Sequence, residues 1–275
     1  PDPGEKTGSL GGNVSTNAGG MRAVKYGTTR DYVLAMTVVL PNGQILELGR
    51  SVTKTSSGYS LLHLMIGSEG TLGVITELTL KLIPNPKEDI SFILPFADID
   101  AAISAVPKIK LAGLSPQSIE FMERDIVDSS ANYTGNKIIP TVIDGKEAGA
   151  YILVTLDGND QDEIFQRAET LAEIGDEIGA YDTLVLSHPA DKRAVWEARS
   201  AFLTVIEAET DLIDEMDVVV PVDKIPTFLE YAHEIGDKYE VRIRSFGHAG
   251  DGNLHIYCCA NDMDEAVFLE RSAKV

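Results

Sequence analysis

The stretch Gly247-His248-Ala249-Gly250-Asp251-Gly252-Asn253-Leu254-His255 organises the second half of this chain. Asp-Gly is a strong hairpin signal because both central residues of a type I′ turn need a positive φ. A two-residue turn at Asp251-Gly252 predicts that His248 lies directly opposite His255. Opposed Cβ atoms on one face of a hairpin are about 4.5–5.5 Å apart, so the two imidazoles can converge on one cation. The spacing leaves a second interpretation open, in which both are ordinary histidines of a β-ribbon.

Composition limits the classes to which the protein can belong. The chain has 275 residues, enough for two domains, and carries a formal charge of −20. Such acidity argues against a nucleic-acid or anionic-membrane partner. No apolar run reaches the roughly 18–20 residues of a membrane span, and no secretory signal opens the sequence. The two cysteines, Cys258 and Cys259, are adjacent and form neither a disulfide framework nor a CxxC motif. We therefore expect a cytoplasmic protein.

A linker at Pro84–Asp89 separates two regions of different composition. The first region is rich in Gly, Thr, Ser and Val, and we assign residues 1–86 to it and residues 87–275 to the second. Its pattern predicts a short helix at Ser60–Ile66 and a turn at Pro41–Gly43. The predicted strands of this region are Val33–Leu40, Gln44–Leu48 and Leu72–Leu82.

Beyond the linker, strand patterns alternate with helix patterns, which is typical of a mixed domain. Predicted strands are Ile90–Leu94, Gln117–Phe121, Tyr151–Leu156, Thr183–Leu186 and Met216–Val220, followed by the hairpin Val241–Cys259. Predicted helices are Ile99–Leu111, Gln161–Ile178, Pro189–Ala208, Pro226–Tyr239 and one from Met263. The abrupt start at Pro1 and the uncapped last helix indicate that the sequence begins and ends inside domains.

Two glycine-rich segments carry the chemistry of the first region. Gly11–Gly20 (GGNVSTNAGG) reads as a loop, in which glycine lets the backbone approach a ligand and successive amides can hold phosphate. It matches neither GxGxxG nor GxxxxGK[ST], so neither nucleotide fingerprint applies. From its residues alone it is either a cofactor cradle or a structural loop. The second segment, Gly67–Gly73, reads as the end of a helix followed by a tight turn.

Further motifs accompany these segments along the chain: Lys25-Tyr26-Gly27, the extension of the second segment to Gly67–Thr76, Trp196–Arg199, Met216–Pro221 and Gly247–His255. With Lys25–Gly27, the two glycine-rich segments resemble the later half of the flavin domain of the vanillyl-alcohol-oxidase/PCMH superfamily. The last three motifs resemble the C-terminal domain of the glycolate oxidase large subunit/D-lactate dehydrogenase branch of that superfamily.

The resemblance implies an α+β fold, in which the second half of a PCMH-type FAD-binding domain precedes a ferredoxin-like cap domain with an antiparallel sheet. It also implies that the first flavin subdomain and the C-terminal end are missing.

The same resemblance implies an FAD site in the first region. Residues that would line the flavin are Gly12, Asn13, Thr16, Asn17, Gly19, Gly20, Tyr26 and Gly27. Residues that would border the adenosine half, or the loop that lies against it, are Glu69, Gly70, Gly73 and Ile75.

The second region would supply the substrate site. By resemblance, His248 and His255 are ligands of a divalent metal, Zn, Mn or Fe, and the third ligand lies beyond Val275. Arg199 would bind the substrate carboxylate and Asn253 would hydrogen-bond the substrate. The catalytic base also lies beyond Val275, so no residue here is assigned that role.

Several other ionisable residues receive no role in the substrate site. Glu215 stands where some relatives have a substrate-binding lysine, which weakens the interpretation as a 2-hydroxyglutarate enzyme. Glu120 is left unassigned, and His63, His188 and His233 are interpreted as surface or structural histidines.

The implied reaction is FAD-dependent oxidation of a small 2-hydroxy acid, D-lactate or glycolate, to the 2-oxo acid by hydride transfer to flavin. The implied electron acceptor is an electron-transfer flavoprotein or an iron–sulfur subunit. Three alternatives stay open: a D-2-hydroxyglutarate-type dehydrogenase, an alkyl-glycerone-phosphate synthase-like flavin transferase, and a non-catalytic subunit. The stretch of chain present here is expected to be inactive alone.

Overall fold

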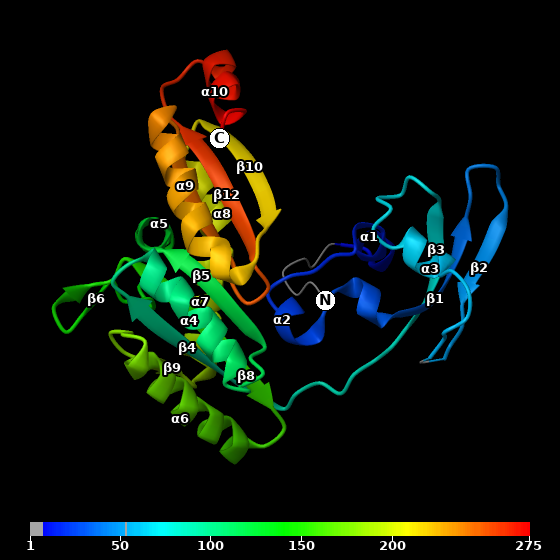
Figure 1. Cartoon of the computed structure of the whole chain (residues 1–275), viewed down its shortest axis with the longest axis horizontal. Helices are drawn as coiled ribbons and strands as arrows, with labels where there is room; N and C mark the ends of the chain where they lie inside the picture. The colour runs from blue at the N-terminus through cyan, green and yellow to red at the C-terminus, as the bar shows by residue number, and fades with distance from the viewer. Residues whose placement is uncertain (1–7, 53) are drawn as a thin grey trace. The chain divides into compact units, whose positions relative to one another are not determined.

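The computed structural model describes residues 8–52 and 54–275, and these form two compact units that divide between Asn85 and Pro86 (Figure 1). Each unit has its own buried apolar core. Among the helices of the described residues, none is long and apolar enough to cross a membrane.

The first unit is built on a small antiparallel sheet in the order β2-β1-β3. Its strands are β1 (Val33–Val39), β2 (Ile45–Gly49) and β3 (Val74–Leu80), so all three predicted strands are present. The helical segments are α1 (Leu10–Thr16), α2 (Ala23–Tyr26), the 3-10 turn η1 (Thr29–Tyr32) and α3 (Leu61–Met65). Val14, Val38 and Met65 belong to the core that joins helices to sheet.

Helix α1 corrects the prediction that Gly11–Gly20 is a loop throughout. Ser9 caps the helix, because its hydroxyl accepts a hydrogen bond from the Gly12 amide at 3.0 Å. Val14 is buried and anchors the helix to the core. Asn17 ends it in the left-handed conformation, with φ of 54°. Cap and burial together outweigh the poor helix propensity of the two glycines.

The second unit is a seven-stranded antiparallel sheet in the order β10-β12-β11-β5-β8-β4-β9. Its strands are β4 (Glu88–Phe96), β5 (Ser118–Glu123), β8 (Ala150–Gly158), β9 (Leu184–Leu186), β10 (Leu212–Val219), β11 (Arg242–His248) and β12 (Asn253–Ala260). Its helices are α4 (Ile99–Leu111), α5 (Arg124–Thr134), α6 (Gln161–Glu177), α7 (Pro189–Ser200), α8 (Phe202–Glu209), α9 (Ile225–Lys238) and α10 (Glu265–Ser272). The short 3-10 turn η2 (Val222–Lys224) precedes α9, and the small hairpin β6 (Val142–Ile143) and β7 (Lys146–Glu147) stands apart from the sheet.

The connectivity of this sheet is ferredoxin-like, as expected. The run β4-α4-β5-β8-α6-β9 places its strands in the order β5-β8-β4-β9, the βαββαβ arrangement. The run β10-α9-β11-β12 repeats the first part of the same pattern. The two runs meet where β11 pairs with β5, with Phe246 opposite Met122 and Gly247 opposite Phe121. The centre of the sheet is therefore a junction between segments about 120 residues apart.

The sheet has an apolar layer on each face, because successive side chains of a strand point to opposite faces. On β5, Phe121 belongs to the layer covered by α4, α6 and α9, whereas Met122 belongs to the layer covered by α5, α7 and α8.

The predicted single helix Pro189–Ala208 is broken at Ala201 into α7 and α8. Helix α5 was not predicted, because only three of its residues are buried and no turn signal separates it from β5.

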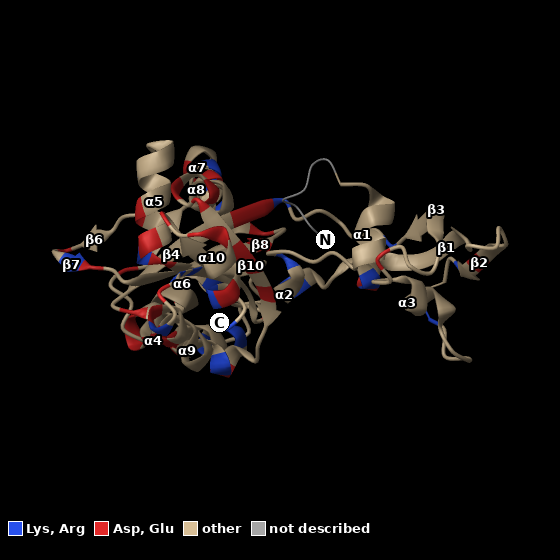
Figure 2. Ribbon diagram, turned by 90° about the horizontal axis from the view of Figure 1, so that it is seen from above, with Lys and Arg blue, Asp and Glu red and all other residues tan. Residues whose placement is uncertain are grey.

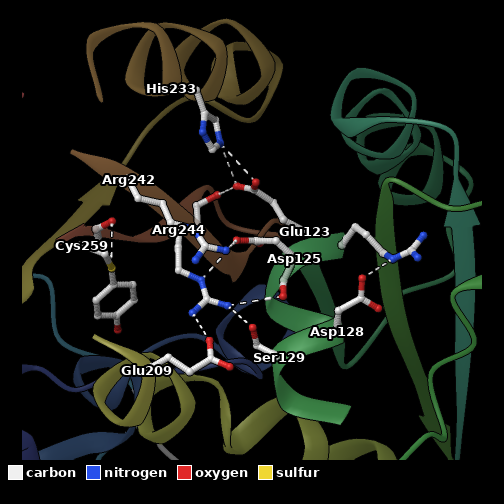
Figure 3. Close-up of polar contacts among 12 residues, drawn as sticks. Glu123, Asp125, Asp128, Ser129, Glu209, His233, Arg242, Arg244 and Cys259 are labelled. Atoms are coloured by element: carbon white, nitrogen blue, oxygen red, sulfur yellow. Dashed lines mark hydrogen bonds and ion pairs between the residues drawn. The ribbon is translucent and has the colours of Figure 1, made fainter. Parts of the chain in front are cut away.

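A buried charged network ties the sheet to α5 and α8 (Figure 3). Arg244 of β11 is fully buried. Its Nε lies 3.2 Å from Asp125, its Nη1 donates to Glu209 at 2.9 Å, and its Nη2 donates to the Ser129 hydroxyl at 2.7 Å. A buried guanidinium is tolerated only when its donors and its charge are compensated, so these three residues are required for Arg244 to lie there.

On the other face of β5, Glu123 joins the sheet to α9 (Figure 3). The Ser245 hydroxyl donates to Glu123, and the His233 Nε2 lies 3.2 Å from the same carboxylate. The hydrogen bond to Glu123 raises the pKa of His233, partly offset by burial, which lowers it. The folded state therefore binds a proton at His233 more tightly than the unfolded chain does.

The His233–Glu123 contact predicts a pH-dependent stability. Because the folded-state pKa is raised, the contribution is complete below the unfolded value of about 6.5 and is lost as the pH rises through the folded value. His233→Gln should therefore lower the thermal unfolding midpoint more at about pH 6 than at about pH 8.5. His188→Gln, at an exposed histidine of the same unit, is the control for loss of an imidazole. An equal effect of His233→Gln at both pH values would contradict the prediction.

Candidate functional site

The β11–β12 hairpin places His248 and His255 through a register that differs from the prediction. His248 pairs with Asn253 and Phe246 pairs with His255, so four residues form the loop and the predicted two-residue turn is wrong. Of these four, all within the described part of the chain, Gly252 alone has a positive φ, 88°. A type I′ turn needs two such residues. The amides of Asp251 and Gly252 instead both donate to the His248 carbonyl, at 3.1 and 3.0 Å.

The two histidines still share one face of the hairpin. The register differs from the predicted one by two residues, and side chains alternate with a period of two, so the shift leaves both imidazoles on the same side. Their ring centroids lie 5.4 Å apart and the ring planes are nearly perpendicular, at 87°. His248 and His255 are thus diagonal neighbours instead of a directly opposed pair, and they converge as expected.

The hairpin loop is held by three other segments. The Gly250 amide donates to the Ile119 carbonyl at 3.1 Å, and the Lys110 ammonium of α4 donates to the Gly250 carbonyl. The Val220 amide, just beyond β10, donates to the Gly252 carbonyl at 3.0 Å. These contacts fix the end of the hairpin that carries His248.

Glu120, which the sequence left unassigned, lies at the centre of the site. Its side chain on β5 is fully buried. Its Oε1 lies 2.8 Å from Nδ1 of His248, and its Oε2 accepts a hydrogen bond from Nη2 of Arg199 at 2.8 Å. A glutamate between Ile119 and Phe121 was the available signal, because an ionised side chain is rarely fully buried without a partner. Its partners come from positions about 80 and 130 residues away.

Arg199 on α7 is buried beside Glu120. Only 7% of the residue is exposed, and its guanidinium carbon lies 4.5 Å from the centre of the Phe246 ring and 5.4 Å from that of Phe202. Aromatic faces attract a guanidinium at these distances. Its Nε is buried and has no hydrogen-bond partner within the described residues. Within the described residues only Nη2 is used, for Glu120, so the guanidinium keeps charged donors for an anionic ligand.

The charges of these groups are strongly coupled. Burial raises the pKa of the Glu120 carboxyl, but Arg199 and His248 lower it further, so it lies below its usual value. Burial lowers the pKa of His248, whereas Glu120 raises it, with a net increase. The pKa of His255 is lowered by burial and by the positive charges of His248 and Arg199. A neutral His255 keeps a ring nitrogen able to bind a cation.

Strand β10 adds carboxylates at the edge of the sheet. Its exposed side chains include Glu215 and Asp217, which pair across to Tyr257 and His255 of β12. The Tyr257 hydroxyl donates to Glu215 at 2.9 Å, and Asp217 lies 3.7 Å from Nδ1 of His255. The Asn253 amide group donates to Asp217 and to the Val218 carbonyl. Figure 2 shows that this second unit carries most of the acidic residues.

The predicted metal site is not supported by the described residues. Two imidazoles converge, but the described residues contain no group of three or more His, Cys, Asp or Glu side chains placed to hold a metal ion. Imidazole nitrogens are a donor type that Zn, Mn and Fe accept, but two of them are an incomplete ligand set.

In the first unit, the structure brings the two glycine-rich segments together. The Gly67 amide donates to the Val14 carbonyl at 3.1 Å, and the Glu69 amide donates to the Ser15 carbonyl at 2.8 Å. Asn17 has a structural role, because its side-chain oxygen accepts hydrogen bonds from the Thr28 hydroxyl and the Arg30 amide.

At two of the positions predicted to contact FAD, contacts within the chain already require a glycine. Gly27 has φ of 75°, and a Cβ there would lie 2.1 Å from the Asp31 carboxylate; a Cβ on Gly73 would lie 2.6 Å from Val38. The other predicted residues lie on or near the surface, with the exception of buried Gly20. Those that are exposed, and therefore accessible to a ligand, are Gly12, Thr16, Gly19, Glu69 and Gly70; those partly buried are Asn13, Tyr26 and Ile75.

Family models match both units. Residues 85–272, more than half of the chain, match the family described as FAD linked oxidases, C-terminal domain. Residues 1–49 match the family described as FAD binding domain.

Individual proteins are also similar. A D-lactate dehydrogenase of Anaerostipes hadrus is 55% identical over 273 residues, which are 99% of this chain and 58% of that protein. The glycolate oxidase subunit GlcD of Bacillus subtilis is 35% identical over 278 residues, covering 99% of this chain and 57% of that protein. The solved structure of p-cresol methylhydroxylase with substrate bound matches with a TM-score of 0.69 at 14% identity, covering 96% of this chain and 57% of that one, which supports the PCMH-type fold. The chain thus spans between half and two thirds of the length of these proteins.

The hairpin loop predicts a strong effect of Gly252→Ala. A Cβ at this position would lie 2.1 Å from the Val220 carbonyl oxygen, and φ is 88°. We expect the free energy of unfolding to fall by more than the roughly 1–3 kcal/mol of an unfavourable φ alone. Gly145→Ala is the matched control, because Gly145 has φ of 77° with nothing within 4 Å of the added methyl. Equal losses for the two variants in urea denaturation would contradict the clash.

The Arg199–Glu120 pair predicts a second stability effect. Arg199→Met leaves a buried carboxylate without its cation, which should lower the free energy of unfolding by about 3–5 kcal/mol. Adding Glu120→Gln to Arg199→Met should recover most of this loss, because the uncompensated charge is removed. Arg193→Met, at an exposed arginine of the same helix, should change stability by no more than about 0.5 kcal/mol. A double variant as unstable as Arg199→Met would show that lost packing, not charge, is responsible.

Proposed function

We propose that this chain, which belongs to the family of FAD-linked oxidases, is part of an enzyme that oxidises a small 2-hydroxy acid, D-lactate or glycolate, to the 2-oxo acid. The observation that carries the proposal is the buried guanidinium of Arg199, whose Nε is unpartnered within the described residues, in one cluster with His248 and close to His255. A charged donor beside two imidazoles matches a substrate with a carboxylate next to a hydroxyl. The similar D-lactate dehydrogenase and glycolate oxidase subunit support the same class of substrate.

Arg199 would bind the substrate carboxylate. One donor, Nη2, is taken by Glu120, so Nε and the other N–H groups of the guanidinium remain for an anion. Burial strengthens this interaction, because the effective dielectric constant in the interior is lower than in water. Asn253 would orient the substrate through its amide, which Asp217 and the Val218 carbonyl hold in place.

His248 and His255 would hold a divalent ion, Zn, Mn or Fe, with further ligands from outside this pair. Such an ion would supply Lewis-acid polarisation of the 2-hydroxyl. FAD would supply the two-electron acceptor for the oxidation. Gly12, Gly19 and Gly70 would lie against FAD, because their exposed backbone leaves room for close approach.

The charge at the edge of the sheet favours a monocarboxylate substrate. Glu215 and Asp217 lie 4.0 and 3.7 Å from Nδ1 of His255, so a second carboxylate on the substrate would meet negative charge there. This disfavours D-2-hydroxyglutarate relative to D-lactate and glycolate.

The flavin transferase and the non-catalytic subunit are alternatives, and the flavin titration described below tests them. The cytoplasmic location and an electron-transfer flavoprotein or iron–sulfur acceptor are further proposals that rest on the sequence resemblance.

Anaerobic titration of the full-length flavoprotein tests the proposal. D-Lactate or glycolate should bleach the flavin absorption band. D-2-Hydroxyglutarate should act at least about tenfold more slowly, the effect of roughly 1.4 kcal/mol of repulsion. Arg199→Lys should slow bleaching at low substrate concentration, because a lysine lacks the planar fork that matches a carboxylate. A protein that binds flavin but is bleached by none of the three acids would contradict a dehydrogenase and favour the alternatives.

A further inference from the structure

Glu120 does more in this site than neutralise Arg199. A carboxylate at the centre of a sheet costs several kcal/mol to desolvate, and Arg199 alone could provide the compensating charge. Yet both oxygens of Glu120 also lie close to one nitrogen of His248, Oε1 at 2.8 Å and Oε2 at 3.0 Å from Nδ1. The carboxylate therefore reaches two partners on two different elements, α7 and β11.

The chemistry of this contact restricts the proton positions on His248. The guanidinium of Arg199 stays charged at any ordinary pH, and it holds Glu120 at 2.8 Å as an ionised carboxylate. An ionised carboxylate has no proton to donate and can only accept hydrogen bonds. The Nδ1 of His248 must then be the donor. In a neutral imidazole the other nitrogen, Nε2, keeps its lone pair.

We propose that Glu120 is a positioning residue that fixes the Nδ1–H tautomer of His248, leaving Nε2 free to bind a cation together with His255. The cation in this inference rests on the proposed function, but the tautomer of His248 depends only on the contact between Glu120 and His248. A carboxylate behind a ligating histidine is a common way to set the tautomer and ring orientation of that ligand. The same carboxylate also anchors Arg199, so one buried charge orients both the cation side and the substrate-carboxylate side of the site.

The chain contains a matched control on the opposite face of the same strand. Glu123 also lies near a histidine, with His233 Nε2 at 3.2 Å, and accepts a hydrogen bond from Ser245. It belongs to the face covered by α9, away from Arg199 and His248. Glu123→Gln therefore removes a comparable carboxylate–histidine contact without touching the site.

Histidine-selective ¹⁵N NMR of the full-length protein tests the tautomer of His248 directly. At a pH high enough for His248 to be neutral, its signal, assigned by its loss in His248→Ala, should show the Nδ1–H tautomer in the wild type. Glu120→Gln should shift His248 toward the Nε2–H tautomer, because the glutamine amide can donate to Nδ1. Glu123→Gln should leave His248 unchanged. A wild-type His248 in the Nε2–H tautomer, or one whose tautomer is the same in Glu120→Gln, would overturn the proposal.

Calorimetric titration with Zn²⁺ alone tests the consequence. Glu120→Gln should weaken Zn²⁺ binding by about 10–100-fold, the usual effect of losing such a partner. His255→Ala, which removes a ligand, should weaken it at least as much, and Glu123→Gln should bind as the wild type does. Binding by a folded Glu120→Gln variant within about twofold of the wild type would overturn the proposed role.

The two measurements separate this inference from the proposed function. A wild type that binds no Zn²⁺ and is not bleached by 2-hydroxy acids would contradict the proposed function, whereas the tautomer measurement would still decide the role of Glu120. If Glu120→Gln does not fold, the wild-type tautomer decides alone: we expect Nδ1–H because Glu120 can only accept, and Nε2–H would overturn the proposal.

Discussion

A carboxylate buried in the middle of a sheet must have partners, and this constraint organises the second unit. Glu120 is fully buried on β5, and its charge is compensated by Arg199 from α7 and by His248 from β11. Each partner in turn depends on its own surroundings: Arg199 lies against the rings of Phe246 and Phe202, and His248 lies at the fixed end of a hairpin. Removing the carboxylate would leave a buried guanidinium unpaired. The arrangement of β5, α7 and the β11–β12 hairpin around this cluster therefore depends on Glu120.

The sheet topology is what makes this cluster possible. The two ferredoxin-like runs meet at the β5–β11 pair, and the ladder that pairs Phe246 with Met122 brings Glu120 next to His248. The face on which they lie is the one covered by α5, α7 and α8, so Arg199 reaches it from α7. The opposite face carries its own polar contact, between Glu123 and His233. The same strand thus supports two unrelated polar arrangements because its side chains alternate.

Local sequence patterns predicted much of this architecture and missed identifiable parts of it. The strands of both units and the helix at Ile99–Leu111 follow from hydrophobic periodicity, which depends only on neighbours along the chain. Helix α1 was missed because its stability comes from the Ser9 cap and the burial of Val14, against the propensity of its glycines. Helix α5 was not predicted because few of its residues are buried. The break between α7 and α8 at Ala201 was not predicted because the apolar stripe continues across it. The turn at Asp251-Gly252 was predicted too short because the backbone contacts to Ile119 and Val220 come from other elements.

The sequence by itself determined the residue types of the site and the face they share, since a period of two places His248 and His255 on one side whichever of the two registers forms. It also determined the family to which the motifs point. Only the tertiary structure decided which groups surround those histidines. Glu120, Arg199 and His248 are far apart in the chain, and nothing local couples them. Their association follows from the pairing of β5 with β11 and from the free-energy cost of burying a charge without a partner, which is a property of the folded interior and not of any segment.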